Sequence, residues 1–171
     1  MAVRAAAATM GALLVGGGTD AVQAQKPLPG GCFARDYTSR ELARRPEQVV
    51  DRLSLFIRPE PASGGTAADL AVVLADQGHA GRDRLGGARM VQSLVCWQEA
   101  APRGMLWRCG VGCDGGGLKV MHQDGEVLEI MTKGLLVGGG EGCGGRTDLA
   151  EAPGKPVTYR LFRAGPEACG R

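Results

Sequence analysis

Six cysteines constrain the fold of this 171-residue chain more than any other feature. Two of them, Cys109 and Cys113, lie in the glycine-rich segment 107–117, between segments with strand-like patterns. An even number of cysteines in an exported chain predicts disulfides, because compartments outside the cytoplasm are oxidising. We therefore predict three disulfides formed among Cys32, Cys96, Cys109, Cys113, Cys143 and Cys169.

The first residues of the chain indicate export. Arg4 precedes an apolar run at 5–15 that is too short to cross a bilayer, and Ala24 ends a small-residue site typical of signal cleavage. We predict a signal peptide at 1–24, a flexible lead-in at 25–31 and a single β-rich domain at 32–171. The expected location is the periplasm or the medium, with no membrane span after cleavage.

Composition limits the core and the partners. Aromatic residues make up only 4% of the chain, whereas glycine occupies 29 positions. Glycine loses the most backbone entropy on folding, so valine, leucine and isoleucine must form the core and disulfides are expected to support it. The net charge of +2 is too small and too dispersed to predict nucleic acid or an anionic membrane as partner.

Alternating polar and apolar residues predict a chain of short strands. Asp124-Gly125 separates two of them and predicts a hairpin with a type I′ turn, which needs positive φ at both central residues. Between strands, 77–88 is polar and is predicted to be a surface loop. The predicted strands are 50–58, 69–76, 90–98, 105–113, 118–123, 126–131 with an extension at 135–137, and 157–163.

One helix is expected before these strands. Thr38 and Glu41 form a capping-box pattern, which predicts a short helix at 39–45 that Pro46 ends. No strand–helix–strand rhythm follows. The fold class is therefore mostly β: a small antiparallel sandwich or barrel with one short N-terminal helix, linked by disulfides.

Six cysteines allow 15 pairings, and sequence does not choose between them. Cys113 and Cys143 lie in matching Gly-x-Gly-Cys-x-Gly stretches, which suggests that they pair. By elimination, Cys96 would bond Cys109 across adjacent strands, and Cys32 would join the two ends by bonding Cys169.

Catalytic and cofactor motifs are weak. Two matches to G-x-G-x-x-G, at 110–115 and 140–145, do not open a periodic helix, so no nucleotide or other cofactor is predicted. His79 and His122 are expected in a loop and a hairpin, and no serine lies in a nucleophile motif. We predict no catalytic and no metal residues. Two arginine groups, Arg82, Arg84 and Arg89 and then Arg103 and Arg108, are expected to form a solvated rim.

Several segments resemble a family of small exported proteobacterial proteins of unknown function. They are Cys32-Phe33, 42–49, the Cys-Gly-Val-x-Cys-Asp-Gly-Gly core at 109–116, 143–145 and Cys169. The resemblance covers most of the mature chain. It supports export and the cysteine interpretation, and it implies no activity.

These observations lead to one leading hypothesis and two alternatives. The leading hypothesis is an exported non-enzymatic β-domain that acts as an envelope binding or inhibitor-like module through its loops, with an envelope protein as a possible partner. The first alternative is a metal- or redox-active thiolate protein centred on Cys109 and Cys113. The second is an enzyme whose carboxylates meet only in three dimensions.

Overall fold

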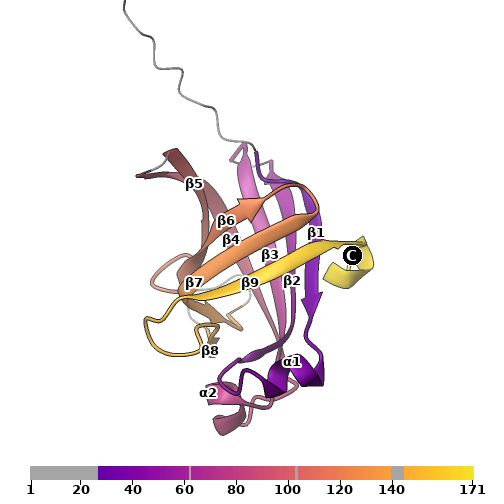
Figure 1. The fold of residues 1–171 in the computed structure, drawn as a ribbon. Helices are drawn as coiled ribbons and strands as arrows, with labels where there is room; N and C mark the ends of the chain where they lie inside the picture. The colour runs from indigo at the N-terminus through magenta and orange to yellow at the C-terminus, as the bar shows by residue number, and fades with distance from the viewer. Residues whose placement is uncertain (1–26, 62, 103, 140–144) are drawn as a thin grey trace, which may run out of the picture.

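A computed structural model describes residues 27–61, 63–102, 104–139 and 145–171. Within this part, eight antiparallel strands close into a barrel (Figure 1). Neighbours in sequence pair from β1 to β7, then β7 pairs with β9 and β9 pairs with β1. The strands are β1 (Gly31–Asp36), β2 (Val50–Glu60), β3 (Gly65–Leu74), β4 (Arg89–Ala101), β5 (Gly104–Gly110), β6 (Gly116–Gln123), β7 (Val127–Val137) and β9 (Val157–Ala164).

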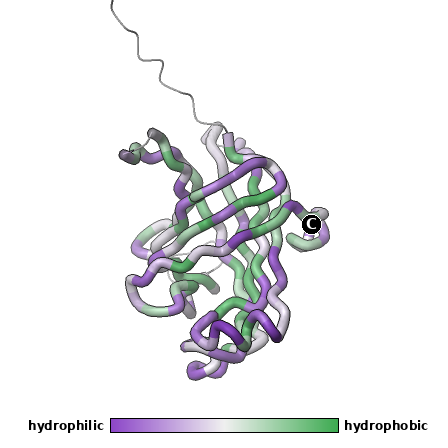
Figure 2. Tube along the Cα trace, in the orientation of Figure 1, coloured by the Kyte–Doolittle hydropathy of each residue, from purple (hydrophilic) through white to green (hydrophobic). Residues whose placement is uncertain are grey.

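The predicted alternation places the core inside this barrel. Leu53, Leu55 and Ile57 of β2 are buried, and Leu70 and Leu74 of β3 face the same interior. Figure 2 shows hydrophobic residues recurring along the strands and hydrophilic residues concentrated near the helical end of the barrel. A small eight-stranded barrel is just wide enough for side chains to fill, and leucine, valine and isoleucine supply most of them here. The prediction of a mostly β fold is confirmed, and the architecture is a barrel, not a sandwich.

The hairpin around Gly125 is confirmed, but its turn type is not. Asp124 Oδ1 accepts hydrogen bonds from the backbone N–H groups of Glu126 (2.9 Å) and Val127 (2.7 Å). Of the two central residues, only Gly125 has positive φ, at 101°. The aspartate side chain therefore organises a turn one residue longer than the predicted type I′ turn. These two bonds also hold the pKa of Asp124 at about 2.

Helical structure differs from the prediction in number. The capping box of Thr38 and Glu41 is present, and it starts α1 (Ser39–Ala43), two residues shorter than expected. A second helix, α2 (Gly78–Arg82), lies in the segment predicted as a loop, and a 3-10 helix, η1 (Pro166–Cys169), follows β9. The expectation of a single helix is therefore wrong. The additional helices are only one turn or so long, which is too short to produce an amphipathic periodicity in the sequence.

Other differences occur at strand ends. β1 and the two-residue β8 (Thr147–Asp148) were not predicted, and the strand expected over 105–113 stops at Gly110. There the N–H of Val111 donates to Gly116 O at 3.1 Å and Cys113 has a φ of 58°, so the chain turns. Leu28 belongs to the core cluster, which anchors the end of the expected flexible lead-in 25–31. The predicted signal peptide, 1–24, lies outside the described residues.

Candidate functional site

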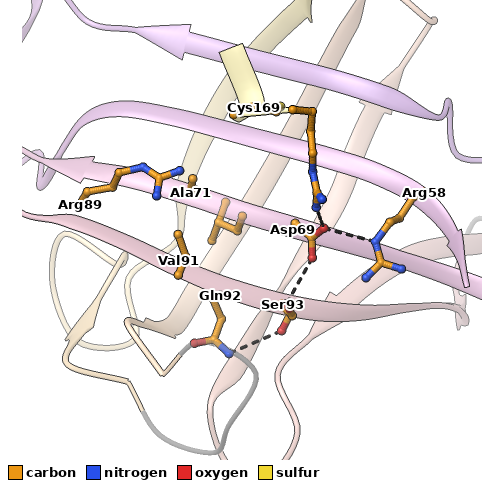
Figure 3. Close-up of a pocket in the computed structure, with 11 residues that line it drawn as sticks. Arg58, Asp69, Ala71, Arg89, Val91, Gln92, Ser93 and Cys169 are labelled. Carbon is orange, nitrogen blue, oxygen red and sulfur yellow. Dashed lines mark hydrogen bonds and ion pairs between the residues drawn. The ribbon is translucent and has the colours of Figure 1, made fainter. Parts of the chain in front are cut away.

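A groove of about 490 Å³ crosses the outer wall of the barrel over β3 and β4 (Figure 3). The antiparallel register places Phe56 opposite Asp69 and Asp69 opposite Ser93, so the outer faces of β2, β3 and β4 meet there. Three arginines line the groove from different parts of the chain: Arg58 on β2, Arg89 at the start of β4, and Arg171 after η1.

Asp69 is the centre of the polar network in this groove. Its Oδ2 lies 3.2 Å from Arg58 Nε and also accepts a hydrogen bond from Arg171, while Ser93 Oγ donates to its Oδ1 at 3.2 Å. Arg58 also contacts Glu60 at 3.1 Å. Hydrogen bonds to Asp69 and Glu60 raise the pKa of Arg58 above the ordinary value of an arginine side chain. The carboxylate is thus shared among three donors, an arrangement suited to holding side chains in place.

Arg89 differs from the other two arginines. Its side chain borders the groove in Figure 3 without a marked interaction, and it makes no ion pair or hydrogen bond within the described part of the chain. The residue is exposed. A free guanidinium is suited to bidentate recognition of a carboxylate or phosphate from outside.

An exposed apolar strip continues from the groove along β4. The side chains of Val91, Val95 and Trp97 are 43%, 65% and 42% exposed. Val95 lies opposite Gly110 of β5, which has no side chain to cover it, and Trp97 lies opposite Arg108. We call these three β4 residues, together with Arg89, the β4 face.

Trp97 is held on this face by its neighbours. The Arg108 guanidinium carbon lies 6.0 Å from the centre of the indole ring. A Cβ atom added to Gly110 would lie 2.9 Å from the same ring, so the glycine lets the indole lie against β5. Arg108 itself is fixed by Glu99, 3.1 Å away. The indole is therefore positioned while part of its surface remains available to a partner.

Two predicted disulfides are confirmed. Cys96 bonds Cys109 between directly opposed positions of β4 and β5, and Cys32 bonds Cys169 across 137 residues. The third predicted pair includes Cys143, which lies outside the described residues. None of the described cysteines is a free thiol.

The disulfide of Cys32 helps to build the groove. Cys32 lies on the outer face of β1 opposite Phe56, so its bond to Cys169 holds η1 against the wall of the barrel. Arg171 then reaches over the Phe56 ring, with 5.0 Å between guanidinium carbon and ring centre, and on to Asp69. The terminal segment thus forms one side of the groove.

A second cleft of about 520 Å³ lies at the end of the barrel near β8. It contains the sequence-selected His79, whose Nε2 is 3.1 Å from Ala150 O, and Arg82, which is 3.8 Å from Glu47. Asp148, on the same cleft, accepts from the backbone N–H of Leu135. Within the described ranges, no three histidine, cysteine or acidic side chains lie close enough together to hold a metal.

The remaining sequence-selected residues are dispersed. His122 lies in the hairpin 3.4 Å from Asp124, far along the chain from the groove residues. Arg84 is an exposed turn residue with a φ of 58°, and Arg103 lies outside the described residues. Of the described members of the two arginine groups, only Arg89 borders the groove.

Sequence reasoning missed Arg58, Asp69 and Arg171 as neighbours. Arg58 and Asp69 alternate outward on adjacent strands, which is a usable signal once the pairing of β2 with β3 is known. Arg171 carries no such signal, because only the disulfide at Cys169 brings it to the groove.

Comparisons with known protein families, with curated proteins and with solved structures found no match. The two described disulfides are typical of an oxidising compartment outside the cytoplasm. Among the described helices, all are too short to cross a membrane.

Proposed function

We propose that this chain is an exported binding module that recognises a partner protein of the cell envelope through the β4 face. The two disulfides support a periplasmic or secreted location, and so does the signal-like segment at 1–24. We expect the protein to act without catalysis, as a scaffold that presents a fixed surface to its partner.

One observation carries the proposal: apolar exposure is concentrated on one side of the barrel. In the described part of the chain, three of the six exposed large hydrophobic residues lie on the outer face of β4, namely Val91, Val95 and Trp97. Exposed apolar patches rimmed by polar groups mark interaction surfaces more often than chance exposure does. Arg89 and Arg108 flank the apolar patch on β4. Tryptophan and arginine are among the residues that contribute most of the binding energy at protein interfaces.

The two alternatives require other arrangements. A thiolate centre at Cys109 would need the bond to Cys96 to be reduced, in a residue that is fully buried. A carboxylate enzyme would need acidic groups free to exchange protons, whereas Asp69 is bound by Arg58, Arg171 and Ser93. The β4 face needs no such change, because its side chains are already exposed.

Site-specific photo-crosslinking in cells of the source organism tests the proposal. Val95 is replaced by p-benzoylphenylalanine, and the matched control carries the same group at Met121, which is 53% exposed on β6. We expect a discrete protein adduct from position 95 that is absent from position 121. No adduct at 95, or the same adducts at both positions, would contradict a β4 binding face.

A second variant separates recognition from mere proximity. Trp97→Ala is expected to remove about 2 kcal/mol or more of binding free energy, enough to abolish the adduct at position 95 at cellular concentrations. Phe162→Ala, at an exposed aromatic of β9, is the control and should leave the adduct intact. An adduct that survives Trp97→Ala would show that Trp97 does not contribute to recognition of the partner.

A further inference from the structure

A second hollow on the outer wall is distinct from the arginine groove. It lies over β5, β6 and β7 and has a volume of about 330 Å³. Three cationic side chains line it, Arg108, Lys119 and Lys133, and so does Met131. The remaining lining consists of Gly116, Gly117 and Gly134.

The sheet register brings these cations together. Arg108 lies directly opposite Lys119, and Lys119 lies directly opposite Met131. Adjacent strands are about 4.8 Å apart, so the side chains of Arg108 and Lys119 leave the outer face from neighbouring positions and both line the hollow. Lys133 joins them because β7 has a register shift between the partners of Gly117 and Leu118.

Positive charge in this hollow is largely uncompensated. Among the residues that the structure describes, no acidic side chain lines it. Lys119 and Lys133 make no ion pair with any residue in the described ranges, and Arg108 alone has a carboxylate partner, Glu99, at 3.1 Å. Like charges that line one hollow repel one another, and a bound anion would relieve that repulsion.

The floor of the hollow is bare backbone. A Cβ atom on Gly117 would lie 2.6 Å from Cys109 O, and one on Gly116 would lie 2.1 Å from Gly134 O. Gly116 also has a φ of 76°, which side-chain-bearing residues rarely adopt. Glycine is therefore required here by strand packing, and one result is space beneath the cationic groups.

We propose that Arg108, Lys119 and Lys133 form a binding site for a small multivalent oxyanion, carrying carboxylate or phosphate groups, on the outer face of β5–β7. The volume fits the lower end of small-molecule sites. The lysines act as mobile point charges, and Arg108 supplies a planar donor already oriented by Glu99. The site is separate from the β4 face, although Arg108 borders both.

Titration of the oxidised, ¹⁵N-labelled protein at low ionic strength tests this site. The probes are citrate, inorganic pyrophosphate and, as a monovalent comparison, acetate. We expect amide shifts at Gly116, Gly117 and Gly134 with citrate or pyrophosphate, and at least tenfold weaker effects with acetate. Citrate alone would identify a carboxylate site, pyrophosphate alone a phosphate site, and both a general oxyanion site.

Charge-removing variants provide the decisive comparison. Lys119→Gln with Lys133→Gln should weaken binding of the better probe by at least tenfold while leaving the dispersed spectrum of a folded chain. Lys155→Gln with Arg44→Gln removes the same charge from exposed positions elsewhere and should leave the affinity within twofold. Equal weakening in both variants, or shifts centred on Gly170 beside the arginine groove, would overturn the proposal.

Discussion

Two sides of the barrel wall differ in how the chain covers them. Over β1 and β2, the terminal helix η1 lies against the outer surface, as Figure 1 shows at the C-terminal end. Phe56 is half-buried there beneath Arg171. Over β4, no described segment covers Val95, which is 65% exposed. Outward apolar residues occur on both sides, but only those over β1 and β2 are covered by another segment of the described chain.

This difference separates two uses of an outward apolar side chain. Phe56 stabilises the contact between η1 and the wall, so its exposure would reduce stability. Val95 contributes little to the fold, because water already reaches most of it. The covered side is therefore expected to respond to mutation in folding experiments, and the bare side in binding experiments.

The largest effect is expected on the covered side. Replacing Cys32 and Cys169 together by alanine opens a 137-residue link, and the loop-entropy relation predicts a loss of about 5 kcal/mol in the free energy of unfolding. The matched pair Cys96→Ala with Cys109→Ala opens a 13-residue link and should cost about 3 kcal/mol. Urea unfolding measures both; a smaller loss for the Cys32 pair would show that η1 does not hold the wall.

A smaller effect distinguishes the two faces of β4 itself. Leu94 is 2% exposed and points inward, whereas the next residue, Val95, points outward. Leu94→Ala should cost about 3 kcal/mol, since it leaves a cavity in the barrel interior. Val95→Ala should change stability by less than about 0.5 kcal/mol. If thermal and urea unfolding gave similar losses for both, Val95 would be covered in solution and the bare side would not exist.

Much of the barrel wall could be predicted from local pattern. Alternation identified seven of its strands, because each has a buried and an outward face. The pairing of Cys96 with Cys109 was reached only by elimination, because alternation does not give the register in which β4 opposes β5. β1 was not predicted, because Gly31–Asp36 is short and its buried residues Cys32 and Phe33 are consecutive and do not alternate with exposed ones. Closure of the barrel rests on β1 pairing with β9, a contact between the two ends that no local pattern reveals.

The candidate site was less predictable, for a reason visible in β4. Both faces of this strand are apolar, with Leu94 and Cys96 on one and Val95 and Trp97 on the other. Alternation separates the two faces but does not say which is inward when both are hydrophobic. The groove also depends on Arg171, which reaches Asp69 only through the fold. Such a site requires knowledge of strand order.

The smallest effect is expected at the glycines of the bare side. Gly117→Ala places a Cβ atom 2.6 Å from the backbone oxygen of Cys109, so β5 and β6 must move apart, and we expect a loss of about 1–3 kcal/mol. Gly112→Ala is the control, because no heavy atom lies within 4 Å of its added Cβ and its φ is not in the left-handed region. Its free energy of unfolding should stay the same or rise by less than about 1 kcal/mol. Urea unfolding of the two variants checks this, and equal values would mean that the strands separate at no cost where the wall is uncovered.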